Sequence, residues 1–108
     1  MKHTKSHMVI SIILTLLFTS CGVDYHFKNA ERLKDEGKYE KAIAKYRKII
    51  NKFPTSKLSN TSQFTIANIY LYKLKNYQQA KIEYYLFLKN YPSDSKVNKV
   101  KDEIAKID

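Results

Sequence analysis

The side chains that could carry out chemistry are few and widely spaced in this chain of 108 residues. Cys21 is the only cysteine, and His26 is the only histidine beyond the first seven residues. The carboxylate pairs Asp35–Glu36 and Asp102–Glu103 are sequence neighbours, so on helices their members point to different sides and we expect solvated surface charges. Side-chain catalysis needs a nucleophile beside a base, paired carboxylates in a cleft, or clustered metal ligands. We therefore expect no enzyme, no metal site and no bound cofactor.

Residues 1–20, ahead of Cys21, have the layout of a secretory signal peptide. Lys2 and Lys5 give a basic start, and an apolar run follows from Val9 to Phe18. The run is about 10 residues long, whereas a membrane-spanning helix needs about 20. We therefore expect this segment to be cleaved rather than kept as an anchor.

The residues from Leu17 to Cys21 resemble a bacterial lipobox, although Phe18 stands where leucine is usual. The resemblance implies that Cys21 becomes the first mature residue and carries covalent diacylglyceryl and N-acyl lipid, which would anchor the protein to a membrane. The alternative is a free or buried cysteine behind an ordinary signal peptide. Because a lone exported cysteine has no disulfide partner in its own chain, lipidation is favoured.

Gly22 follows the cysteine, whereas aspartate there is the usual signal for inner-membrane retention in Gram-negative bacteria. The lipobox resemblance therefore implies a lipid anchor on the periplasmic face of the bacterial outer membrane. The alternative location is the outer face of the cytoplasmic membrane.

The formal net charge is +10, and loss of residues 1–20 lowers it to +8. Nearly all of the positive charge is lysine, since Arg32 and Arg47 are the only arginines. Arginine supplies bidentate recognition of phosphate and guanine, so nucleic-acid binding is disfavoured. A lysine-rich face that touches anionic lipid headgroups remains an alternative function.

A repeat defines the architecture that must position any site. A shift of 38 residues aligns six positions: Tyr39 with Tyr77, Ala42 with Ala80, Tyr46 with Tyr84, Ile50 with Leu88, Phe53 with Tyr91, and Pro54 with Pro92. A period in this range without strand-like alternation predicts an all-α solenoid built from helical hairpins.

The second helix of each repeat has the clearest pattern. Apolar residues recur at steps of three and four from Tyr39 to Phe53 and again from Tyr77 to Tyr91. Lys81 stands in the second copy where Ile43 stands in the first. The prolines that follow end both helices, because proline has no amide hydrogen to donate.

The first helices are less regular. Asn29 to Glu36 is expected to be helical and to end at Gly37. In the second repeat a helix-starting turn is expected over 55–61. One apolar stripe follows it in the sequence, formed by Phe64, Ala67, Leu71 and Leu74. Ile66, Ile69, Tyr70 and Tyr72 add apolar area on other faces, which predicts a helix sandwiched between neighbours or carrying a binding surface.

A final helix is expected after Pro92, with Val97, Val100, Ile104 and Ile107 on its buried face as a cap that closes the solenoid. The expected division is a signal peptide over 1–20, the lipidated cysteine and a short linker over 21–26, the first hairpin over 27–54, the second over 55–92, and the capping helix over 93–108.

These features resemble tetratricopeptide repeats, which have an aromatic residue and then a small residue early in the second helix and a proline after it. The glycine of the helix turn is present as Gly37 and is replaced by Lys75 in the second copy. Together with the lipobox, residues 30–57 and 66–95 resemble the amino-terminal repeats of the BamD family of bacterial outer-membrane assembly lipoproteins.

The family resemblance implies a groove lined by the first helices of the two repeats. In the first repeat it places Phe27, Glu31, Lys34 and Asp35 there, and in the second Thr65, Ile69, Tyr72 and Lys73. Ile69 and Tyr72 are the strongest candidates for partner contact, because they are apolar and lie off the main packing stripe. The alternative is that both pack against the capping helix.

The resulting expectation is a lipid-anchored, non-catalytic scaffold that binds other envelope proteins. The resemblance implies partners among the subunits of the outer-membrane β-barrel assembly machinery and its unfolded barrel substrates. Alternatives are an adaptor in cell-wall or division coordination, a basic membrane-surface protein, and an accessory paralogue that is stable only with a partner.

Overall fold

The computed structural model describes residues 22–108, so Cys21 and the predicted signal peptide lie outside the described part. The first helix covers 22–35 and is followed by α2 (Tyr39–Lys52), α3 (Lys57–Asn68), a π-helix η1 (Ile69–Lys73), α4 (Tyr77–Asn90) and α5 (Val97–Ile107). Within this range every regular element is helical, and no helix is long and apolar enough to cross a membrane.

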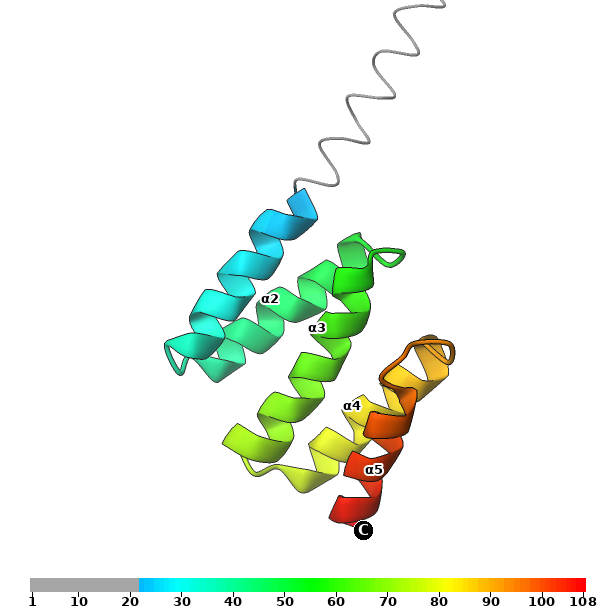
Figure 1. Cartoon of the computed structure of the whole chain (residues 1–108). Coiled ribbons are helices and arrows are strands. Elements are labelled where there is room, and N and C mark those ends of the chain that lie inside the picture. Colours follow the sequence, from blue (N-terminus) through cyan, green and yellow to red (C-terminus); the bar gives the residue numbers. More distant parts are fainter. Residues whose placement is uncertain (1–21) are drawn as a thin grey trace, which may run out of the picture.

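The helices stack as antiparallel hairpins, with α5 at the end of the stack (Figure 1). The first helix pairs with α2, the continuous α3 and η1 pair with α4, and α5 packs on α4. The predicted all-α solenoid of two hairpins and a C-terminal helix is therefore confirmed.

The second helices of the two hairpins repeat each other closely. Tyr39–Lys52 and Tyr77–Asn90 are both 14 residues long and begin 38 residues apart. Each ends on an aromatic residue in the same backbone conformation, Phe53 at φ −128°, ψ 57° and Tyr91 at φ −131°, ψ 56°. A proline follows each of these residues and prevents the helix from continuing.

α3 is sandwiched between neighbours, which is one of the two alternatives that its apolar pattern left open. Ile66 and Ile69 pack into one core with the first helix and α2. Ala67 and Leu71, on the opposite side, pack into a second core with α4 and α5. One helix therefore belongs to both cores and fixes the position of one hairpin against the other.

The start of the described part differs from the prediction of a linker over 21–26. Residues 22–26 are helical, because Val23, Phe27 and Ala30 continue one apolar face toward the N-terminus. Gly22 also lies close to the Phe53 ring, 3.5 Å from where its Cβ would be. The folded domain therefore directly follows Cys21 in the sequence.

The turn predicted over 55–61 is shorter than expected. α3 begins at Lys57, and the Ser56 side chain caps it by accepting a hydrogen bond of 3.2 Å from the Leu58 amide. Ser59, which the prediction placed in the turn, is a buried helical residue whose hydroxyl donates to the carbonyl oxygens of Ile49 and Phe53. The Ser59 hydroxyl thus ties α3 to the end of α2.

α5 buries the predicted face: Val100 and Ile104 are buried, and Val97 and Ile107 are packed against the second core. Lys81, the replacement for Ile43, forms an ion pair with Asp108 rather than packing as an apolar residue would.

The expectation that Glu103 is a solvated surface charge was wrong. Only 6% of it is exposed, because its position on α5 faces η1.

Two apolar residues near the α3–α4 turn were also predicted wrongly as packing residues. Tyr77 is 53% exposed, and Leu74 is exposed as well. Leu74 directly follows η1, whose wider turn rotates it away from the stripe that Ala67 and Leu71 begin, and Tyr77 opens α4 after the turn.

Candidate functional site

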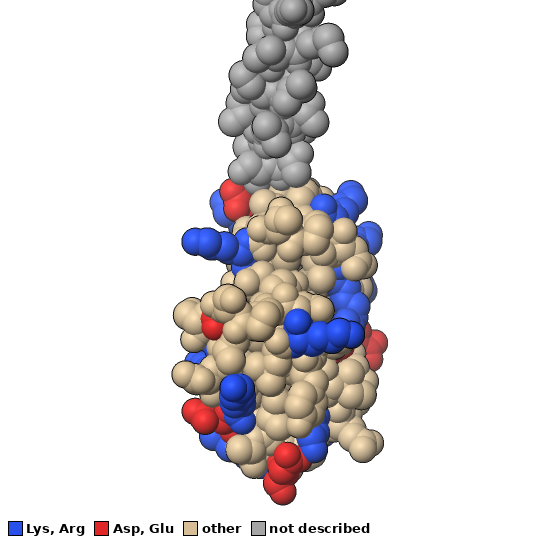
Figure 2. Space-filling view, turned by 90° about the vertical axis from the view of Figure 1, so that its right-hand side faces the viewer, with Lys and Arg blue, Asp and Glu red and all other residues tan. Residues whose placement is uncertain are grey.

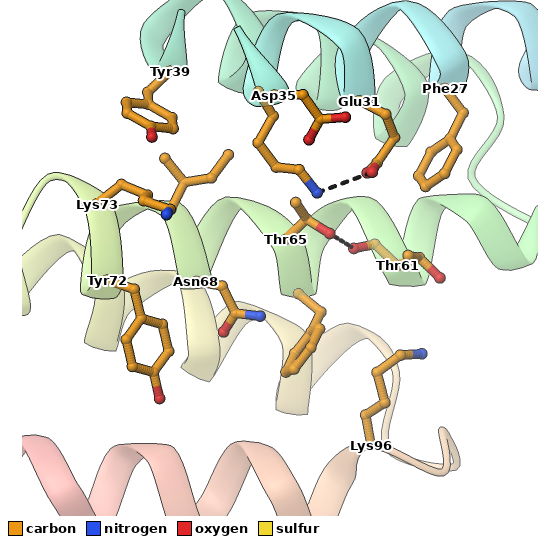
Figure 3. A pocket seen from close by; sticks show the side chains of 13 residues that line it. Phe27, Glu31, Asp35, Tyr39, Thr61, Thr65, Asn68, Tyr72, Lys73 and Lys96 are labelled. Atoms are coloured by element: carbon orange, nitrogen blue, oxygen red, sulfur yellow. Dashed lines mark hydrogen bonds and ion pairs between the residues drawn. The ribbon is translucent and has the colours of Figure 1, made fainter. Parts of the chain in front are cut away.

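A groove of about 740 Å³ lies between the first helix and α3–η1, and the start of α5 closes one side (Figure 3). Its lining comprises Phe27, Glu31, Lys34, Asp35, Tyr39, Thr61, Phe64, Thr65, Asn68, Ile69, Tyr72, Lys73 and Lys96. All eight residues that the family resemblance assigned to a groove are in this set. The structure thus brings them together, whereas their role in partner binding stays a prediction.

The eight predicted residues differ in how far a partner could reach them. Ile69 is only 1% exposed and packs in the core between the hairpins, so it forms the floor of the groove. Thr65 is also buried, and its hydroxyl donates to the Thr61 carbonyl at 2.8 Å. Asp35 and Lys73 are exposed at the rim. The rim, not Ile69, is therefore the accessible part.

The alternative of packing against the capping helix applies to Tyr72 and not to Ile69. The Tyr72 ring points toward α5 (Figure 3), and its hydroxyl donates to the Glu103 carboxylate. This hydrogen bond raises the pKa of Tyr72 above its ordinary value. Because 48% of Tyr72 is exposed, it still presents an aromatic face to a partner.

One wall of the groove is fixed from behind by tyrosines of the second helices. Tyr46 of α2 donates its hydroxyl to Glu31, which also accepts from Lys34 at 2.9 Å. Burial, and then the bond to Glu31, raises the pKa of Tyr46 far above its usual range. Tyr84 of α4 donates in the same way to Asn68, so each hairpin has a tyrosine that orients one groove residue.

The groove residues that precede η1 correspond to those of the first hairpin at a shift of 37 and not of 38. Phe27 stacks edge-on against Tyr46 at 6.0 Å, and Phe64 lies against Tyr84 at 6.4 Å. These contacts match Phe27 with Phe64, whereas the uniform shift had matched Phe27 with Thr65. The helical turn of η1, closed by a hydrogen bond of 3.0 Å from the Leu74 amide to the Ile69 carbonyl, accommodates the extra residue.

The π-helix is itself part of the groove, since Ile69, Tyr72 and Lys73 all belong to it. Short π-helices inside α-helices occur frequently at functional sites. Sequence reasoning missed this one, although the change of shift from 38 between the second helices to 37 between Phe27 and Phe64 is visible in the sequence.

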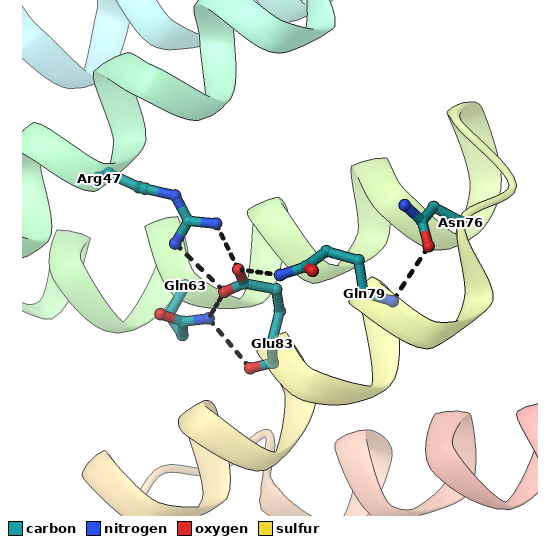
Figure 4. Close-up of polar contacts among 5 residues, drawn as sticks. All are labelled: Arg47, Gln63, Asn76, Gln79 and Glu83. Carbon is teal, nitrogen blue, oxygen red and sulfur yellow. Dashed lines mark hydrogen bonds and ion pairs between the residues drawn. The ribbon is translucent and has the colours of Figure 1, made fainter.

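A buried polar cluster that the sequence reasoning also missed joins the two hairpins (Figure 4). Glu83 of α4 is 1% exposed and accepts hydrogen bonds from both terminal nitrogens of Arg47 on α2. Gln63 of α3 donates to the same carboxylate at 2.7 Å, and Gln79 donates at 3.2 Å. The hydrogen bonds to Glu83 raise the pKa of Arg47, so the guanidinium stays charged.

The arrangement of the groove suits non-covalent binding of a polypeptide. Its apolar floor is surrounded by lysine and carboxylate side chains and by the Asn68 amide, which are groups able to form hydrogen bonds with a peptide backbone or side chains. Among residues 22–108 no group of three or more histidine, cysteine or carboxylate side chains is placed to hold a metal ion.

A family model described as tetratricopeptide repeat matches residues 29–56 and 61–94, which together make up more than half of the chain. No curated protein sequence matches this chain.

Proposed function

The chain belongs to the tetratricopeptide repeat family, whose repeats mediate protein–protein interactions, and we propose that it is a lipid-anchored scaffold that binds envelope polypeptides in its groove. In this proposal Cys21 carries diacylglyceryl and N-acyl lipid, and the protein catalyses no reaction. The observation that carries the proposal is the groove between the first helix and α3–η1, where an apolar floor meets a charged rim.

The lipid anchor and the groove would be close together. The first helix already includes Gly22, and no linker separates it from the proposed acylated residue. The groove residues Phe27 and Glu31 are on this same helix. A lipid on Cys21 would therefore hold the groove near the bilayer, where partners that are themselves membrane-bound are concentrated.

The finer proposal concerns the partners. The family resemblance favours subunits of the outer-membrane β-barrel assembly machinery and unfolded barrel substrates, with the protein on the periplasmic face of the outer membrane. An adaptor for cell-wall or division proteins would use the same groove. The identity of the protein that occupies the groove separates these two proposals.

The face shown in Figure 2 gives no support to binding of a membrane surface through a lysine-rich patch. On the face shown in Figure 2, lysine and arginine side chains are scattered among uncharged ones and accompanied by carboxylates, rather than gathered in one patch. Attraction to anionic lipid depends on several cations that approach the surface together. The groove is therefore the better candidate for recognition.

The experiment that tests the proposal uses the protein in its own membranes. The tagged full chain is purified in detergent, the mass of its N-terminal peptide is measured, and the polypeptides that co-purify are identified. We expect acylated Cys21 and a defined envelope partner that is lost in the rim variant Lys73→Glu. The matched control is Lys101→Glu, the same charge change on the exposed side of α5, which should retain the partner.

Two results would overturn parts of the proposal separately. An exported chain with an unmodified Cys21 would remove the lipid anchor and leave the groove untouched. A partner that Lys73→Glu and Lys101→Glu release to the same extent would remove the groove as its binding site.

A further inference from the structure

A second hollow of about 460 Å³ lies beyond the groove, between η1, the α3–α4 turn and the C-terminal end of α5. Tyr72 lines both spaces and separates them. Leu71 and Ile107 form the apolar base of the second hollow, and Tyr77 is part of its wall. The proposed function does not use this space.

The second hollow exposes more aromatic surface than the equivalent place in the first hairpin. Tyr77 is half exposed, whereas Tyr39, its counterpart 38 residues earlier, is packed against the first core. With Tyr72, which is also half exposed, it gives the hollow two aromatic walls. Exposed tyrosines around a concave apolar base are a common feature of binding surfaces.

The charges around the second hollow favour an anionic occupant. Glu103 is its only carboxylate, and it is already engaged by the Tyr72 hydroxyl and by Lys106 at 3.5 Å. The Lys106 side chain is still largely exposed. Lys75 forms no ion pair with any residue that the structure describes. Two lysines therefore line a hollow with an apolar base: Lys106 lies beside the already engaged Glu103, and Lys75 has no ion-pair partner among the described residues.

The backbone of Lys75 adds a separate observation. Its φ is +54°, in the left-handed region that side chains other than glycine rarely adopt, and the matching residue of the first hairpin is Gly37 at φ +77°. Glycine would satisfy this turn with less strain. A strained residue at the edge of a hollow is a reason to look for a function of its side chain.

From these features we propose that the second hollow binds a polypeptide segment in which aliphatic or aromatic side chains stand next to carboxylates. The apolar side chains contact Leu71, Tyr77 and Ile107, and the carboxylates pair with Lys75 and Lys106. A flat lipid surface does not enter a concave space of this kind, and no arginine lines the hollow for phosphate recognition. An acidic and apolar polypeptide fits both the shape and the charge.

The test measures peptide binding to the full chain in detergent by fluorescence anisotropy. The probe is a short labelled peptide of phenylalanine and leucine flanked by aspartates, and a second peptide carries serines in place of the aspartates. We expect the acidic peptide to bind several-fold more tightly than the serine peptide. We expect Lys75→Gly and Lys106→Gln each to weaken it about fivefold, as loss of an accessible ion pair does.

Two design features separate binding from folding and from the main groove. Lys75→Gly relieves the left-handed strain, so its loss of binding cannot follow from unfolding. Lys96→Gln makes the same charge change at the other end of α5, about 15 Å from Lys106 at 1.5 Å per residue, where it lines the main groove. This variant should bind the acidic peptide as the unaltered chain does.

The proposal is overturned if the acidic peptide does not bind, if the serine peptide binds equally well, or if Lys75→Gly and Lys106→Gln have no effect. A larger loss in Lys96→Gln than in Lys106→Gln would place the peptide in the main groove. Neither result would bear on whether a partner occupies the main groove in the envelope, which the Lys73→Glu experiment measures.

Discussion

The polar cluster around Glu83 makes a strong prediction about what holds the two hairpins together. Replacing Arg47 with methionine keeps most of the apolar stem of the side chain and removes its charge. The buried carboxylate then keeps only the amides of Gln63 and Gln79 as partners. We expect this to be the most destabilising single change among the polar residues that join the hairpins.

The magnitude follows from the burial of the two partners. Removing one partner of a fully buried ion pair costs about 3–5 kcal/mol. Glu83 is almost fully buried, but the Arg47 side chain is 41% exposed, so water replaces part of what the guanidinium supplied. We therefore expect a loss of about 2–3 kcal/mol, which corresponds to a fall in Tm of about 10–20 °C for a domain of this size.

The assay is urea unfolding followed by circular dichroism at neutral pH, which reports the free energy of unfolding of each variant. Lys48→Met is the matched control, because Lys48 is an exposed residue of the same helix, and it should change stability by less than about 0.5 kcal/mol. The double variant Arg47→Met with Glu83→Met should recover much of the loss, since it leaves no unpaired buried charge. This expectation is wrong if Arg47→Met is as stable as Lys48→Met. It is also wrong if the double variant loses as much stability as the single variants Arg47→Met and Glu83→Met lose in sum.

Three further changes test other parts of the account. Lys75→Gly should raise the free energy of unfolding by about 1 kcal/mol, because it places glycine in a left-handed turn. An unchanged or lower free energy in urea unfolding would show that the Lys75 backbone is not strained. Tyr84→Phe should cost about 1 kcal/mol in the same assay through the lost bond to Asn68, and no measurable cost would show that the hydroxyl does not support the groove wall. Burial alone would raise the pKa of Asp94, but hydrogen bonds from Asn60 and Lys96 outweigh burial and hold that pKa below its ordinary value. The Asp94 carboxylate therefore stabilises the fold above its unfolded pKa, and this contribution is lost as the pH falls below about 4. Asp94→Asn should therefore be less stable at pH 7 and lose less stability between pH 5 and pH 2, and an acid limb of unaltered steepness would rule out this linkage.

The second helices were the most predictable part of the fold. Their bounds, their shift of 38 and the aromatic residues that end them follow from apolar periodicity and from the prolines after them. The sandwiched position of α3 was predicted as one of two alternatives, because apolar residues on several faces of a helix indicate either neighbours on more than one side or a binding surface. These features depend on local pattern and on burial, which a single sequence contains.

The missed features depend on contacts between residues far apart in the chain. Glu83 is buried because Arg47 and Gln63 contact it from two other helices, and the sequence around Glu83 does not predict those partners. Glu103 is similar, since only the docking of α5 brings it to Tyr72. From the local sequence alone a charged residue is predicted to be exposed. Its burial is favourable only where the fold supplies partners from other elements.

The candidate groove was predictable as a set of residues but not in its detail. Family resemblance brought eight residues to one surface, and the structure places all of them along one groove. The π-helix adds one residue between the positions before and after it, and Ile69 lies in the floor of the groove rather than at the accessible rim. Because the second helices correspond at a shift of 38, applying that shift uniformly mismatches the residues that precede η1, such as Phe64.

We propose above all that the groove between the first helix and α3–η1 holds a polypeptide partner. The most direct test of this proposal is photo-crosslinking in the native membrane from a reactive side chain placed at Lys73, on the rim, with a second protein placing it at Lys101 on the outer side of α5. We expect Lys73 to crosslink to one defined segment of an envelope polypeptide and Lys101 not to do so. Crosslinks from Lys73 to lipid alone, or the same polypeptides from both positions, would contradict this proposal.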